Sequence, residues 1–112
     1  ESTQEQIGFP FRRLAADEGI LAPDHFVYVR GGVGSRKALE RALFDLRPGV
    51  TELYLHPGLN TPELRAAYPT DWSGRVDDHH LLVHDRNFRS LLRDSGVITI
   101  GWRALKAAQR AG

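Results

Sequence analysis

The chemistry suggested most directly by this chain is that of His56, which ends an apolar run and is followed by Pro57 and Gly58. The run over residues 50–55 has the composition of a strand, and functional side chains of parallel α/β folds lie where strands end. An imidazole there can act as a general acid or base, or bind a metal, and Gly58 lets backbone approach a ligand. The alternative is a strand-end histidine satisfied by local backbone, followed by an ordinary turn.

A second candidate is the pair His80 and His84, whose spacing of four puts both on one face of a helix, as in zinc-binding pairs. The three residues between them are all apolar and do not include the glutamate of zinc proteases. The pattern also suits an amphipathic helix with one wet side. We prefer that second interpretation and assign no metal ligand within the chain.

Residues 30–37, with the sequence RGGVGSRK, resemble a glycine-rich phosphate loop that opens a helix. Free N–H groups at a helix start attract anions. Neither of the two established glycine spacings is met, so the glycines equally suit a simple strand-to-helix loop.

Trp72 and Arg75 follow the second expected strand in a long polar segment that also contains Asp71. The indole is an apolar plate of the kind that stacks on sugars, and its alternative role is to cover a thin core. We keep Trp72, Arg75 and Gly58 as candidate substrate-binding residues. Asp24 and His25 precede the first strand, at the amino edge, where side chains usually serve stability.

Hydrophobic spacing and turn residues predict alternating strands and helices. Residues 60–68 read as a helical turn with Thr61 as its cap and Pro62 at the first position, and residues 69–78 read as irregular. Ser35 is the expected cap of the second helix. The expected strands are 25–29, 50–56 and 97–102, and the expected longer helices are 11–18, 36–46, 78–94 and 103–111.

This order predicts an α/β fold of three βα units with parallel strands, in one partial domain over residues 1–112. Half of a (β/α) barrel has this organisation. The length suits one modest domain. The chain has no methionine, even at position 1, so we expect it to begin inside a longer translation product or to have been trimmed.

Composition excludes several classes of function. A hydrophobic share of 41% fits a globular protein, and a net charge of +1 does not favour nucleic acid as a partner. There is no cysteine, which excludes disulfides and thiolate chemistry. No apolar run reaches the ~20 residues of a membrane span, and no signal-peptide pattern is present, so we expect a cytoplasmic protein without a membrane partner.

The sequence PGVTELYLHPG over residues 48–58 resembles a motif of the YdjC-like carbohydrate deacetylases, a family that includes the chitooligosaccharide and hopanoid-biosynthesis deacetylases. The upstream GILAPDHFVY and downstream RSLLRDSGVITIGWRAL segments are similar to that family too, so the resemblance covers most of residues 10–106. It implies the C-terminal half of a (β/α) barrel. The family's aspartate pair and most of its metal-ligand histidines would lie in an N-terminal half absent here.

The resemblance implies removal of acetyl from an N-acetylated sugar with the help of a divalent metal, Mg²⁺ or Zn²⁺, bound mostly by residues outside this chain. His56 would be the active-site acid or a substrate ligand, Gly58 would shape its loop, and Arg75 would match the family's arginine. The chain departs from the family at VDDHH, residues 76–80, just after Arg75. Alone, the chain is expected to be inactive.

A second hypothesis is a small α/β domain without catalytic activity that acts through ligand binding or self-association. Three parallel strands would leave two open sheet edges, and pairing of those edges would favour a homo-oligomer. A start codon immediately before Glu1 would favour this hypothesis, whereas an upstream extension with an acidic metal motif would favour the deacetylase.

Overall fold

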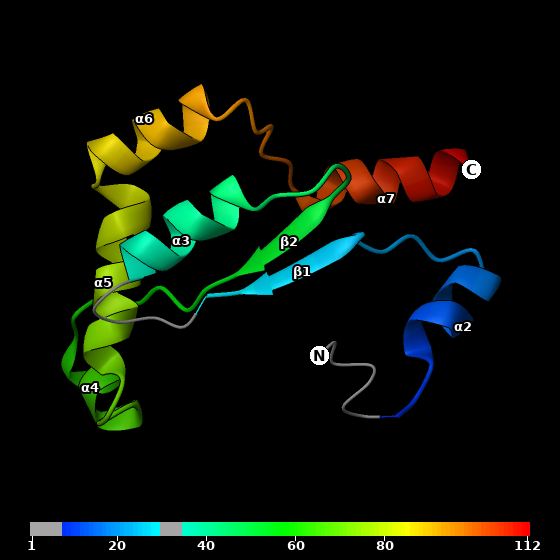
Figure 1. Cartoon of the computed structure of the whole chain (residues 1–112). Coiled ribbons are helices and arrows are strands. Elements are labelled where there is room, and N and C mark those ends of the chain that lie inside the picture. The colour runs from blue at the N-terminus through cyan, green and yellow to red at the C-terminus, as the bar shows by residue number, and fades with distance from the viewer. Residues whose placement is uncertain (1–7, 30–34) are drawn as a thin grey trace. The chain divides into compact units, whose positions relative to one another are not determined.

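The computed structural model describes residues 8–29 and 35–112. The chain divides into two compact units, one made of Glu1–Pro23 with Ile98–Gly112 and the other of Asp24–Val97. Its helices and strands are shown in order along the chain in Figure 1. The larger unit contains both strands and the predicted site residues.

Two parallel strands, β1 (His25–Tyr28) and β2 (Thr51–Tyr54), form the sheet of the larger unit. His25 pairs with Thr51 and Tyr28 with Tyr54. Helix α3 (Ser35–Phe44) connects the strands, as parallel pairing requires. The prediction of a mixed α/β chain with parallel strands is therefore confirmed at this level. The loop over 30–34 lies outside the described residues, and with it the proposed phosphate loop and the cap expected from Ser35.

A hydrogen bond stabilises the amino edge of the sheet: Asp24 Oδ2 accepts the N–H of Val50 at 2.8 Å. His25 Nε2 lies 3.0 Å from the carbonyl oxygen of Pro48. Between these contacts Gly49 has φ of 114°, and a Cβ there would lie 2.6 Å from Asp24 Oδ2. The expectation of a stabilising role at this edge agrees with these contacts.

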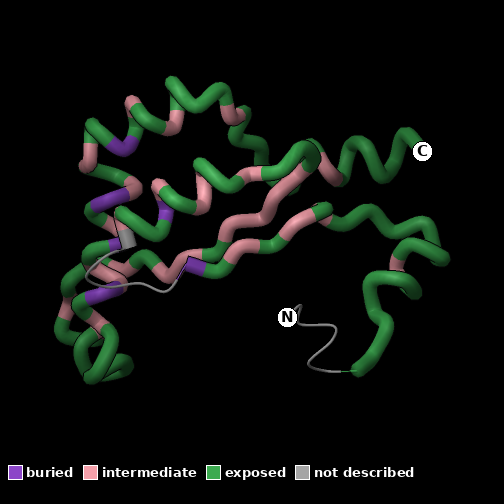
Figure 2. The backbone as a smooth tube through the Cα atoms, in the orientation of Figure 1, coloured by how far each residue is buried: buried purple, intermediate pink, exposed green. Residues whose placement is uncertain are grey.

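The core lies on one face of the sheet. Strand alternation directs Val27 and Leu53 toward the helices, where both pack against the buried cluster. Figure 2 shows the buried positions at the end of β1 and on α3, α5 and α6. The buried apolar side chains are Val29, Leu39, Leu81 and Phe88.

Helix α4 (Pro62–Ala67) forms as its sequence predicts. Thr61 is extended and its hydroxyl accepts the N–H of Leu64 at 3.2 Å, while Pro62 occupies the first turn, where a missing N–H costs nothing. This prediction is confirmed.

The next two predictions are wrong. Residues 72–78 are not irregular but begin helix α5 (Trp72–Val83), and the single helix expected over 78–94 is divided into α5 and α6 (Arg86–Asp94). Gly74 is buried in α5, so packing offsets its poor helix propensity. The division falls at Asp85, whose extended backbone and carboxylate cap α6 by accepting the N–H of Phe88 at 2.8 Å.

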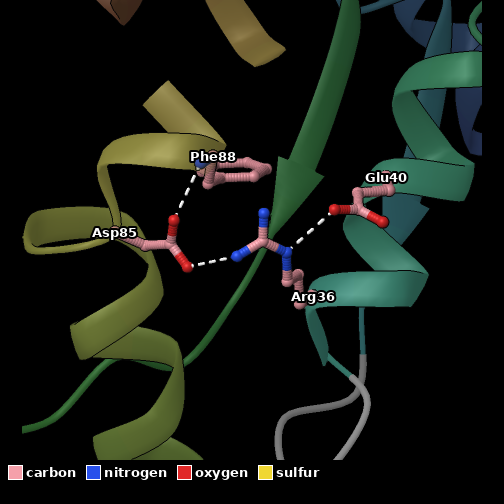
Figure 3. Close-up of polar contacts among 4 residues, drawn as sticks. All are labelled: Arg36, Glu40, Asp85 and Phe88. Carbon is pink, nitrogen blue, oxygen red and sulfur yellow. Dashed lines mark hydrogen bonds and ion pairs between the residues drawn. The ribbon is translucent and has the colours of Figure 1, made fainter. Parts of the chain in front are cut away.

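Asp85 also binds α3. Arg36 Nη1 lies 2.5 Å from Asp85 Oδ2, and Arg36 Nε donates to Glu40 Oε1 at 2.8 Å (Figure 3). The Phe88 N–H, followed by the charge of Arg36, holds the pKa of Asp85 below its usual value. The hydrogen bond to Glu40 and the two carboxylate charges raise the pKa of Arg36.

The third βα unit is not confirmed. Residues 97–101, expected to belong to a strand, are irregular in the structure. Gly96 follows the end of α6 and has φ of 74°. A strand is stable only where a neighbouring strand pairs with its backbone N–H and C=O groups. In the described residues the sheet contains β1 and β2 alone.

The smaller unit contains α2 (Phe11–Asp17) and α7 (Trp102–Ala111), both close to their predicted bounds. Gln109 Oε1 accepts a hydrogen bond from the N–H of Leu21 at 2.5 Å, and Gln109 Nε2 donates one to the carbonyl oxygen of Gly19 at 2.7 Å. One side chain of α7 therefore satisfies the backbone that follows α2.

Candidate functional site

The face of the sheet opposite the core carries a row of rings, which we call the aromatic face: Phe26, Tyr28, Tyr54 and His56. Ring centroids are 6.2 Å apart for Phe26 and Tyr54 and 5.7 Å apart for Tyr28 and Tyr54. Phe26, Tyr28 and Tyr54 are each 45–54% exposed to solvent. Strand alternation explains the row, because residues two apart point to the same face and Tyr28 is the register partner of Tyr54.

His56 lies two residues beyond the end of β2, at the carboxyl edge of the sheet, as the sequence predicts. Its ring meets Tyr54 edge-on, with centroids 4.7 Å apart, and Tyr28 likewise at 5.8 Å. The side chain is half-buried. The imidazole is thus oriented by two phenol rings while part of it stays open to solvent, which suits proton transfer or a hydrogen bond to a bound molecule.

Gly58 packs closely against the helices that follow it. Its N–H donates to the carbonyl oxygen of Arg75 at 2.9 Å. A Cβ at this position would lie 3.0 Å from Leu64 Cδ2 and 3.4 Å from Arg75 Cβ. These contacts explain the glycine through packing of the loop against α4 and α5, without a ligand.

Arg75 and Trp72 lie on the first turns of α5. The Arg75 guanidinium lies 3.7 Å from the ring centroid of Tyr68 and its Nη2 is 3.2 Å from Asp71 Oδ2. Only 18% of the Arg75 side chain is exposed. Trp72 is half-buried, with the Arg65 guanidinium 5.7 Å from its ring centroid.

The structure therefore brings Gly58 and Arg75 together but leaves His56 with different neighbours. The ring contacts of His56 are with Tyr28 and Tyr54, on the aromatic face. Arg75 is joined to Gly58 through backbone and to Tyr68 through its side chain. We therefore treat His56 with its two tyrosines as the candidate site, and Arg75 as a neighbouring group.

Sequence reasoning missed Tyr28 and Tyr54, although strand alternation with His56 gave a signal for both. It also missed Asp78, which is fully buried, and neither of its carboxylate oxygens has a hydrogen-bond partner among the described residues. Helical spacing from Gly74 to Asp78 and Leu81 places this acid on the buried face of α5.

The metal implied by the family resemblance does not fit the residues around His56 by themselves. The neighbouring tyrosine rings offer no carboxylate and no second imidazole. Among residues 8–29 and 35–112, no group of three or more histidine, cysteine, aspartate or glutamate side chains could hold a metal ion. The divalent ion implied by the family resemblance would therefore need ligands beyond the described residues.

Comparison with known proteins found no matching family model, no matching curated protein and no matching solved structure. In the described part of the chain, every helix is too short or too polar to cross a membrane.

Proposed function

We propose that this chain carries the histidine-bearing part of the active site of a metal-dependent deacetylase that acts on N-acetylated sugars. The observation that supports this proposal is the position of His56. It lies at the carboxyl edge of a parallel strand pair and on the face opposite the one that packs against α3, α5 and α6.

That position agrees with barrel geometry. In (β/α) barrels the helices cover the outer face of the strands, and active sites lie at the carboxyl ends of the strands. Helices α3, α5 and α6 supply the core on one side of β1 and β2, so the aromatic face corresponds to a barrel interior. Residues 97–101, which do not form a strand here, match the family segment that forms the last one.

His56 would protonate the departing amine, or hold the substrate by a hydrogen bond. Edge-on contact with Tyr54 and Tyr28 limits rotation of the ring and keeps it aimed along the face. A divalent ion, if bound by residues beyond this chain, would polarise the amide carbonyl and activate water. The resemblance puts the family's aspartate pair and most of its metal ligands outside this chain, so the chain alone is expected to be inactive.

The test is acetate release from N-acetylated oligosaccharides by the whole gene product, with Mg²⁺ or Zn²⁺ added. Replacing His56 with alanine should lower kcat by about 10²- to 10⁴-fold, the usual contribution of a general acid. His25→Gln, at the opposite edge of the sheet, is the matched control and should keep its activity. Full activity in His56→Ala, or no acetate release from any such sugar, would contradict the proposal.

A second candidate function is self-association without catalysis, favoured by the exposed rings of Phe26, Tyr28 and Tyr54. Three half-exposed aromatic side chains offer a few hundred Å², against about 800 Å² per partner in a stable interface. We therefore expect weak association through this face alone. Sedimentation equilibrium of the chain and of Tyr54→Ser would measure it, and a tight dimer unaffected by the substitution would argue for another surface.

A further inference from the structure

We propose that His80 and His84, in the last turn of α5, form a binding site for a transition-metal ion of the Zn²⁺, Ni²⁺ or Cu²⁺ class. Both side chains are exposed, and their ring centroids lie 5.6 Å apart. The site is remote in the sequence from His56 and does not depend on the function proposed for that residue.

The separation of the rings suits a shared ion. Imidazole nitrogen binds zinc at about 2.0–2.1 Å, so two rings on one tetrahedral ion have centroids about 5 Å apart. Exposed side chains on a helix can cover the remaining difference by small rotations about χ1 and χ2. The ring of His79 also lies 5.7 Å from that of His84, but the three imidazoles do not form a three-ligand group within the described residues.

The charges around His80 and His84 include two that favour a bound cation and one that opposes it. His84 is the C-cap of α5, and the carboxyl end of a helix carries a partial negative charge. Asp77 is exposed and lies one turn before His80 on the same stripe. Arg89 donates to the carbonyl oxygen of Val83 and places a positive charge beside the site, which opposes binding.

The number of ligands sets the strength of the site. No three metal-binding side chains meet within the part of the chain that the structure describes. Two imidazoles would therefore hold the ion together with water, as an exchangeable site and not as a closed structural one.

Isothermal titration of the whole chain with ZnCl₂ near neutral pH tests the proposal. We expect one ion per chain, with His80→Ala and His84→Ala each weakening binding at least tenfold. His25→Gln is the matched control, a half-buried histidine at the amino edge of the sheet, and should bind within twofold of the wild type. Loss of binding in His25→Gln would instead place the ion at the amino edge of the sheet and overturn the proposal.

Equal binding by the wild type, His80→Ala and His84→Ala would also overturn it, as would an absence of binding up to about 1 mM zinc, a free energy near −4 kcal/mol. Proton NMR of the wild type gives a readout that needs no variant. The ring signals of His80 and His84 should shift with zinc while those of His25 and His56 stay in place. Shifts confined to His25 or His56 would contradict the assignment.

Discussion

Arg36 of α3 and Asp85 at the start of α6 form an ion pair, with Nη1 and Oδ2 2.5 Å apart, that joins two segments 49 residues apart in the sequence. The same carboxylate accepts the N–H of Phe88 through its other oxygen. One aspartate thus caps a helix and connects that helix to α3.

This arrangement predicts how stability depends on pH. The pKa of Asp85 is lowered in the folded chain, chiefly by the Phe88 N–H and then by Arg36. The folded state therefore binds the proton less readily than the unfolded state, whose pKa is about 3.9. The stabilisation is present above that value and is lost as the pH falls through the lower folded pKa. The pKa of Arg36 is raised as well, but this adds no change at ordinary pH, because arginine is already fully charged there.

Asp85→Asn should consequently lower the urea midpoint at pH 7 and reduce the loss of stability below pH 4. Asp45→Asn is a suitable control, because Asp45 pairs with Arg41 on the surface at 2.7 Å with its side chain 52% exposed. We expect that control to leave the pH profile nearly unchanged. Parallel profiles for the wild type and Asp85→Asn would contradict this role of Asp85.

Gly49→Ala should destabilise the chain through both backbone and contact strain. The residue has φ of 114°, and its new Cβ would lie 2.6 Å from Asp24 Oδ2. Backbone strain alone costs about 1–3 kcal/mol. Gly96→Ala provides the comparison, because φ is 74° there but nothing lies within 4 Å of the Cβ. Urea unfolding should show a larger loss at position 49, and equal losses would indicate that Asp24 simply moves aside.

Asp78→Ala should leave the stability unchanged or increase it. Both carboxylate oxygens are buried and have no hydrogen-bond partner within residues 8–29 and 35–112, and an unsatisfied buried polar group costs about 1–3 kcal/mol. Leu81→Ala, on the same face of α5, should instead lose about 2–5 kcal/mol. The two variants are compared by thermal unfolding. A loss at Asp78 as large as that at Leu81 would show that its carboxylate makes a favourable contact.

Thr61→Ala should cost about 1 kcal/mol, the usual effect of losing a helix N-cap. The hydroxyl accepts the N–H of Leu64, and the side chain of Leu64 packs beside Gly58. Thr61→Ser keeps the oxygen and should retain most of the stability. Chemical unfolding of the three proteins measures the difference, and a serine variant as weak as the alanine variant would argue against the cap.

Local signals in the sequence were sufficient for part of the fold and of the site. Thr61 and Pro62 define the start of α4 by chemistry that acts within four residues. The β-branched and aromatic residues of β1 and β2 predict strands, and a helix between them favours parallel pairing, which needs a crossover connection. The position of His56 at the strand end follows from the same reasoning.

The other features depend on partners distant in the sequence. The break between α5 and α6 occurs where Asp85 both caps α6 and binds Arg36, and no local pattern reports that ion pair. Residues 97–101 have the composition of a strand, but composition cannot supply the neighbour that a strand needs. The contact of His56 with Tyr28 likewise depends on strand register.

By itself the sequence determined the cap of α4, the two strands and the helix between them, because these result from backbone sterics and hydrogen bonds between near neighbours. Only the tertiary structure decided where α5 ends, that Asp78 is buried, and which rings surround His56. Packing and long-range ion pairs select among local conformations of similar free energy, so those choices appear only when distant segments meet.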